Sequence, residues 1–217
     1  MSGWEPSIYK ELGREEFDYP LIADVLKRSG YAAPTKKIHD LMKAGILVGI
    51  KKGFYIVSPD YARGPICKET LANLIYGPSC VSLEYALAHY GFIPERAEVV
   101  TSVTPKRDKK FETPFGDFNY RFLAKEKYSE GIALVWSDPK HPVLMATPEK
   151  ALCDYVVLNK ISHLGNRKEA EKFLLEDLRI QPEALKRFDL VSLQRLNKTY
   201  KNKAVDMILK FLKGHPS

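Results

Sequence analysis

Two helical patterns separated by a short turn restrict the fold of this chain more than any other feature of its sequence. Apolar residues from Ile22 to Leu26 lie at helical spacing, and the pattern stops at Ser29-Gly30-Tyr31. A second segment opens at Ala33-Pro34-Thr35, where proline suits the first helical turn, and it ends at Ala44-Gly45. The sequence therefore predicts two helices joined by a short turn.

The second segment has an apolar side and a polar side. At about 100° per residue, Ile38, Leu41 and Met42 fall together. The opposite side carries Lys36, Asp40 and Lys43, flanked by Lys37 and His39. Because opposite charges one helical turn apart attract each other, we expect Asp40 to pair with these lysines rather than to accept a hydrogen bond from a cytosine.

A compact hairpin follows the second segment. Apolar runs at 46–50 and 54–57 flank Lys51-Lys52-Gly53, whose glycine can take a positive φ. Helix, turn, helix with a polar outer face, then a hairpin with a basic tip is the layout of a winged helix-turn-helix. We therefore expect a domain of this kind over residues 1–60.

Positive charge is concentrated in this region. From Lys27 to Lys52 there are seven Lys or Arg and one acid, so the net charge is 7 − 1 = +6, whereas the whole chain has +7. A helix fits the major groove of DNA, and lysines can bind phosphates or guanines there. The predicted DNA-binding residues are Thr35, Lys36, Lys37, His39, Lys43, Lys51 and Lys52.

Turn chemistry predicts a connector over 61–78, and the remainder, 79–217, reads as a mixed α+β domain. We expect Ser79 to cap a helix that ends at Gly91 and buries Val81, Tyr85, Leu87 and Ala88. A strand follows over 98–104, and two hairpins then turn at 113–116 and 137–139. Thr147-Pro148-Glu149 is a strong helix start, and the chain reads as helical from there to its end.

The composition excludes several classes of protein. Cys67, Cys80 and Cys153 are an odd number without C-x-x-C spacing, which is typical of a reducing compartment with idle thiols. The five histidines are scattered, so we expect no metal and no cofactor. Apolar runs are far shorter than the roughly 18 residues of a membrane span, and no signal peptide is evident. We therefore expect a cytoplasmic protein that does not associate with membranes.

Several ordered motifs between residues 20 and 158 carry a family resemblance. They are Gly53-Phe54-Tyr55, Ser82-Leu83-Glu84-Tyr85-Ala86-Leu87, Gly91-Phe92-Ile93-Pro94, Thr101-Ser102-Val103-Thr104 with Lys106-Arg107, Thr113-Pro114-Phe115-Gly116, and Ala146-Thr147-Pro148-Glu149-Lys150-Ala151-Leu152 with Asp154. In this order they resemble the AbiEi family of antitoxins and transcriptional regulators from type IV toxin–antitoxin (abortive infection) systems. The tail from Ile161 onward matches no part of that pattern.

The resemblance implies a repressor with two functional parts. The N-terminal winged helix would bind double-stranded DNA at an inverted repeat in its own promoter and so autoregulate the operon. The C-terminal domain would counteract a nucleotidyltransferase-like toxin, without a stable complex being required. The family supplies no catalytic residue. The alternative from another class is a protein-interaction adaptor whose winged helix no longer binds DNA.

A metal-dependent nucleic-acid-processing enzyme is a further alternative, because Glu149, Lys150 and Asp154 cluster at a helix start after Asp138. The helix-start chemistry explains the first of these residues, and Lys150 and Asp154, four residues apart, are expected to pair. No Walker, dinucleotide-binding or serine-hydrolase motif is present, and a capping or core role is expected for His89, so we expect no catalytic residues.

A second basic zone lies near the C-terminus. Six Lys or Arg and one acid between 195 and 213 give a net charge of 6 − 1 = +5. A solvated helix face explains this pattern, and the alternative is a surface for a DNA or RNA backbone. The candidate residues are Arg195, Lys198, Lys201 and Lys203.

Overall fold

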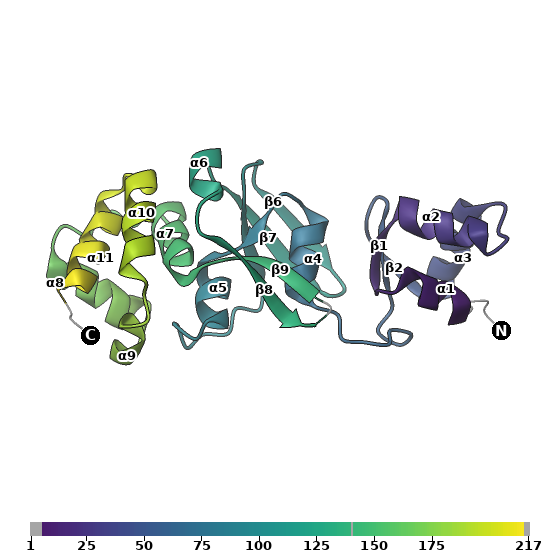
Figure 1. The fold of residues 1–217 in the computed structure, drawn as a ribbon, viewed down its shortest axis with the longest axis horizontal. Coiled ribbons are helices and arrows are strands. Elements are labelled where there is room, and N and C mark those ends of the chain that lie inside the picture. Colours follow the sequence, from purple (N-terminus) through teal and green to yellow (C-terminus); the bar gives the residue numbers. More distant parts are fainter. Residues whose placement is uncertain (1–5, 140, 215–217) are drawn as a thin grey trace. The chain divides into compact units, whose positions relative to one another are not determined.

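The computed structural model describes residues 6–139 and 141–214, and the chain forms two compact units, Met1–Cys67 and Lys68–Ser217 (Figure 1). Each unit is a mixture of helices and strands, and the chain ends in helices. The expected α+β composition with a helical C-terminus is therefore confirmed.

The first unit combines short helices with a three-stranded sheet. Its elements are α1 (Pro6–Leu12), β1 (Glu16–Asp18), α2 (Tyr19–Arg28), α3 (Pro34–Lys43), β2 (Leu47–Lys51) and β3 (Phe54–Val57). Strand β3 is the centre of the sheet and pairs antiparallel with β1 on one side and β2 on the other. Strand β1 was not expected from the sequence, because two of its three residues are acids.

The apolar stripes of α2 and α3 form the core of this unit. Ile22, Val25 and Leu26 are buried with Ile38 and Leu41, as their spacing predicts. Met42 is the exception, with 39% of its surface exposed. It lies at the edge of the stripe, so the predicted assignment of Met42 to the buried side is wrong.

The second unit is built on a six-stranded sheet. Its strands are β4 (Cys80–Val81), β5 (Val100–Thr104), β6 (Lys109–Thr113), β7 (Gly116–Phe122), β8 (Ile132–Asp138) and β9 (His141–Ala146). Its helices are α4 (Lys68–Ile75), α5 (Leu83–His89), α6 (Lys125–Tyr128), α7 (Pro148–Leu158), α8 (Arg167–Lys172), the π-helix η1 (Phe173–Asp177), α9 (Pro182–Leu185), α10 (Leu190–Tyr200) and α11 (Lys203–Lys213).

The strand order is β6-β7-β5-β4-β9-β8, so the two-residue strand β4 joins the two halves of the sheet. Neighbouring side chains of β7 point to opposite faces. The Tyr120 hydroxyl donates to the carbonyl of Ala72 in α4 (2.6 Å), and the Arg121 guanidinium donates to the carbonyl of Leu158 in α7 (2.9 Å). Helices α4 and α7 therefore cover opposite faces (Figure 1).

The helix expected from Ser79 begins later. Ser79 is buried and donates to the carbonyl of Ala72, and Val81 is in β4, where it pairs with Ser102 and Met145. Helix α5 starts at Leu83. Its buried residues are Leu83, Ala86 and Leu87, whereas the expected Tyr85 and Ala88 are half-buried. Sheet pairing, which local sequence does not reveal, takes precedence over the capping pattern.

Both predicted hairpins and the predicted start of α7 are confirmed. Strands β6 and β7 form one hairpin and β8 and β9 the other. The Thr147 hydroxyl accepts from the backbone N–H of Lys150 at the start of α7 (3.3 Å). The expected connector over 61–78 contains α4, which packs in the second unit, so the chain passes between units at Cys67. Among the described residues, no helix has the length and apolar character needed to cross a membrane.

Candidate nucleic-acid interface

Helix α3 presents a polar face to solvent. Thr35, Lys36, His39 and Lys43 fall within an arc of about 100° on the helix, and all four are exposed. The buried Ile38 and Leu41 lie on the other side of the helix and anchor it to the core. These four polar side chains thus point away from the core of the first unit.

Lys37 differs from the other predicted residues of α3. It is half-buried, and its Nζ lies 4.6 Å from the centre of the Tyr31 ring, at the side of the helix away from Lys36. Asp40 is exposed at the edge of the polar face, and among the described residues it pairs with neither Lys36 nor Lys43. The expected ion pairs of Asp40 with Lys36 and Lys43 are not formed in the described part of the chain, so that prediction is wrong.

The tip of the β2–β3 hairpin carries the remaining predicted residues. Lys51 and Lys52 are both exposed, and Gly53 turns the chain with φ = 75°, as its position predicts. The Nζ of Lys51 lies 5.7 Å from the centre of the Phe54 ring. This distance is within the range of a cation–π contact.

Tyr19 connects the hairpin tip to the start of α3. Its backbone N–H donates to the carbonyl of Gly53 (2.8 Å), and its hydroxyl forms a hydrogen bond with the Thr35 hydroxyl (2.8 Å). Because a single residue reaches both places, the tip and the N-terminal turn of α3 lie on the same side of the unit. Sequence reasoning missed Tyr19, although Asp18-Tyr19-Pro20 is a recognisable helix start with an aromatic residue in its first turn.

Three lysines of this surface have no carboxylate partner among the described residues. Lys36, Lys43 and Lys52 form no ion pair with any residue that the structure describes. By contrast, Arg28 in α2 is held by Glu11 and Asp24, and Asp18 accepts from the backbone N–H of Leu21 as the cap of α2. Lys36, Lys43 and Lys52 are therefore available to an anionic partner.

The predicted basic residues of the tail are also exposed. Arg195 and Lys198 lie on α10, Lys201 follows it with φ = 48°, and Lys203 begins α11. Other cations of this zone have partners, since Lys210 pairs with Asp206 at 2.7 Å. The four residues lie on α10, on α11 and in the turn between these helices.

The residues at the start of α7 that suggested an enzyme, Glu149, Lys150 and Asp154, are buried. Lys150 and Asp154 are fully buried and pair at 3.2 Å, as their spacing predicts. The Lys150 ammonium also donates to the Tyr200 hydroxyl (3.0 Å) and to the carbonyl of Lys127 (2.8 Å), so its three protons are all used. Asp154 accepts from the hydroxyls of Ser82 (2.6 Å) and Tyr200. Burial raises the pKa of both the Asp154 carboxyl and the Tyr200 hydroxyl.

The other two carboxylates also have protein partners. Glu149 is 5% exposed and accepts from the backbone N–H of Asp189, at the start of α10 (2.8 Å). Asp138 lies 2.6 Å from the Nδ1 of His141. These contacts fasten α7 to α10 and close the turn of the β8–β9 hairpin, so each carboxylate has a structural role where it stands.

Gly131 makes room for the buried Lys150. Its φ is 77°, and a Cβ at this position would lie only 2.8 Å from the Cβ of Lys150. We expect Gly131→Ala to lower the free energy of unfolding by about 1–3 kcal/mol through overpacking, measured by urea denaturation. Gly45→Ala is the matched control, because Gly45 has φ = 71° and nothing within 4 Å. Equal losses in both variants would contradict the steric explanation.

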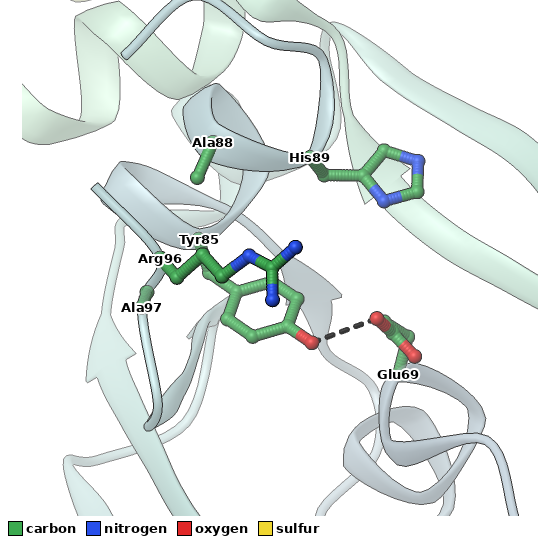
Figure 2. Close-up of a pocket in the computed structure, with 6 residues that line it drawn as sticks. All are labelled: Glu69, Tyr85, Ala88, His89, Arg96 and Ala97. Atoms are coloured by element: carbon green, nitrogen blue, oxygen red, sulfur yellow. Dashed lines mark hydrogen bonds between the residues drawn. The ribbon is translucent and has the colours of Figure 1, made fainter. Parts of the chain in front are cut away.

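A surface pocket of about 260 Å³ lies between α4 and α5. Its lining residues are Glu69, Tyr85, Ala88, His89, Arg96 and Ala97 (Figure 2). The Tyr85 hydroxyl donates to Glu69 (2.7 Å), and His89 is exposed rather than in the expected capping or core role. None of the six is a serine, threonine or cysteine, so the pocket offers no hydroxyl or thiol nucleophile beyond the Tyr85 phenol.

Two of the three cysteines lie in the core of the second unit. Cys80 and Cys153 are fully buried, and burial raises the pKa of both thiols. No protein-family model matches the sequence, and a search of curated proteins finds no match either.

Proposed function

We propose that the first unit is a winged helix-turn-helix that binds duplex DNA, with α3 in the major groove and the β2–β3 hairpin on the backbone. The observation that carries the proposal is the bridge made by Tyr19, which holds the tip at Gly53 and the start of α3 at Thr35 on one side of the unit. A surface that presents both elements together can contact one duplex at two places.

The dimensions and the contacts support this arrangement. An α-helix is about 10–12 Å across with its side chains, and the major groove is about 12 Å wide. Thr35, Lys36, His39 and Lys43 face the groove in this docking, whereas Lys51 and Lys52 reach phosphates, which position a protein without reading sequence. Lys37 leans on Tyr31 and contributes less.

We further propose that the chain is an autoregulating repressor and antitoxin, with the second unit opposing a nucleotidyltransferase-like toxin. This part rests on the resemblance of the ordered motifs to the AbiEi family. A neighbouring gene for such a transferase would support it. Co-expression of that gene is expected to arrest growth, and expression of the full chain to relieve the arrest.

The salt dependence of duplex binding tests the proposed interface. If about five phosphates are contacted, log K plotted against log salt concentration falls with a slope of about −4 to −5. Fluorescence anisotropy with a labelled promoter fragment measures this slope. A flat slope would contradict the proposal and favour the adaptor, in which the same unit binds another protein.

A further inference from the structure

A second group of cations surrounds the β6–β7 edge of the second unit. Lys106, Arg107, Lys109 and Lys110 are all exposed, and with Asp108 they give a net charge of 4 − 1 = +3 over five residues. The single acid of this stretch, Asp108, is also exposed, and its carboxylate accepts from the backbone N–H of Phe122 (2.7 Å). The cations thus dominate the outer surface here.

These cations lack internal partners of opposite charge. None of the four, nor Arg121 on β7, forms an ion pair with a residue in the described part of the chain. Strand β6 is also the edge of the sheet, since β7 is its sole strand neighbour there. Two exposed acids of this edge, Glu112 and Asp117, are cross-strand partners near the β6–β7 turn, so an extended anionic chain can approach the edge at its Lys106–Lys110 end.

Aromatic rings lie directly beneath the cations. The Nζ of Lys106 lies 5.4 Å from the centre of the Tyr76 ring, and that of Lys109 lies 5.8 Å from the Phe111 ring. These two rings contact each other with centres 6.0 Å apart, and Phe122, at the end of β7, is 51% exposed. Cations interleaved with aromatic faces are the combination that holds phosphates and stacks unpaired bases.

A hollow over the two strands is large enough for part of such a ligand. It measures about 580 Å³, within the range of about 300–1,000 Å³ for ligand sites. Its lining residues are Asp108, Lys109, Lys110, Asn119, Tyr120 and Arg121. Lys110 and Asn119 are cross-strand partners, so a cation and a side-chain amide stand side by side on the same face.

We propose that the β6–β7 edge binds a single-stranded polynucleotide, independently of the duplex site proposed for the first unit. The lysines and Arg107 hold the phosphates, and the exposed Phe122 offers ring surface to unstacked bases. The bases of a duplex are already stacked on one another and cannot use these rings, so the site selects single strands.

Fluorescence anisotropy on the full chain tests this site. The probes are labelled oligouridine and oligothymidine of about eight nucleotides, a duplex of the same length, and polyglutamate as an anion without bases. In the full chain with Lys36→Ala and Lys43→Ala, which removes the proposed duplex site, we expect one or both single strands to bind more tightly than the duplex or polyglutamate, and the comparison between the two strands identifies RNA or DNA as the natural source. The proposal would be overturned by no binding of either strand in low salt, or by polyglutamate binding equally well.

Variants locate the binding on the chain. K109A/K110A is expected to weaken single-strand binding about tenfold and to reduce the salt slope by about 1.4, and F122A to weaken binding about tenfold. Lys168→Ala with Lys172→Ala, at two exposed positions of α8, removes the same charge elsewhere in the unit and should change little. Lys36→Ala with Lys43→Ala should leave single-strand binding intact, which separates this site from the duplex site. An equal loss in the Lys168 and Lys172 control, or no loss in F122A, would contradict the assignment. Circular dichroism checks that each variant is folded.

Discussion

Replacing Lys36 and Lys43 with alanine is expected to lower the affinity for promoter duplex about 100-fold, because each lysine supplies one groove or phosphate contact worth roughly 1–3 kcal/mol. The free energy of unfolding should change by less than about 0.5 kcal/mol, because both side chains are exposed and unpaired. A gel-shift titration measures the first quantity, and urea denaturation followed by circular dichroism measures the second.

Lys37 supplies the matched control on the same helix. It has the same charge, but it turns toward Tyr31 at the side of α3 away from Lys36. We expect Lys37→Ala to weaken duplex binding less than about threefold. If Lys37→Ala had the larger effect, or if the double variant lost stability together with binding, the proposed orientation of α3 on DNA would be wrong.

Replacing Lys150 with methionine is expected to lower the free energy of unfolding by about 3–5 kcal/mol, which is the usual cost of leaving one member of a buried ion pair without its partner. The fully buried Asp154 would lose the ammonium that neutralises it, and the carbonyl of Lys127 would lose a donor. Urea denaturation measures the loss, which should fall on the second unit.

Lys210→Met is the control for this prediction. Lys210 and Asp206 have the same four-residue spacing on α11, but their side chains are 55% and 41% exposed. We expect a loss below about 1 kcal/mol, since solvent screens an exposed pair. A comparable loss in both variants would show that burial of the Lys150 pair is not what stabilises the unit. Replacing Lys150 and Asp154 together by apolar residues should recover part of the loss.

The sequence correctly predicted features whose interacting residues are close together along the chain. Thr147-Pro148 starts α7, Gly53 turns the hairpin, and the pairing of Lys150 with Asp154 follows from their spacing on one helix. In each case the residues that interact are within a few positions of one another, so the sequence contains the whole signal.

Features that depend on distant partners were not predictable in the same way. Strand β4 has two residues and no alternation, and it exists because Val81 pairs with Ser102 and Met145. The burial of Lys150 depends on Tyr200, which is 50 residues away. Tyr19 and Thr35 are 16 residues apart and meet through the fold of the first unit.

The predicted DNA-binding residues illustrate both cases. The helical period correctly puts the lysines of α3 outside and Ile38 and Leu41 inside. It does not reveal that Lys37 leans on an aromatic side chain from the preceding turn, nor that Asp40 stays apart from its neighbours. Rotamer choices on a surface depend on which rings and acids happen to be within reach.

The chain crosses from one unit to the other once, after Cys67, and each unit is an uninterrupted stretch of sequence. All strands of the first sheet come from residues 16–57 and all strands of the second from 80–146. Genetic recombination in the codons between these two ranges would replace one whole unit by that of another protein. Every strand pair of the other unit would stay intact. Under the proposed function, the DNA target of the first unit and the partner of the second unit can thus evolve by module exchange as well as by point mutation.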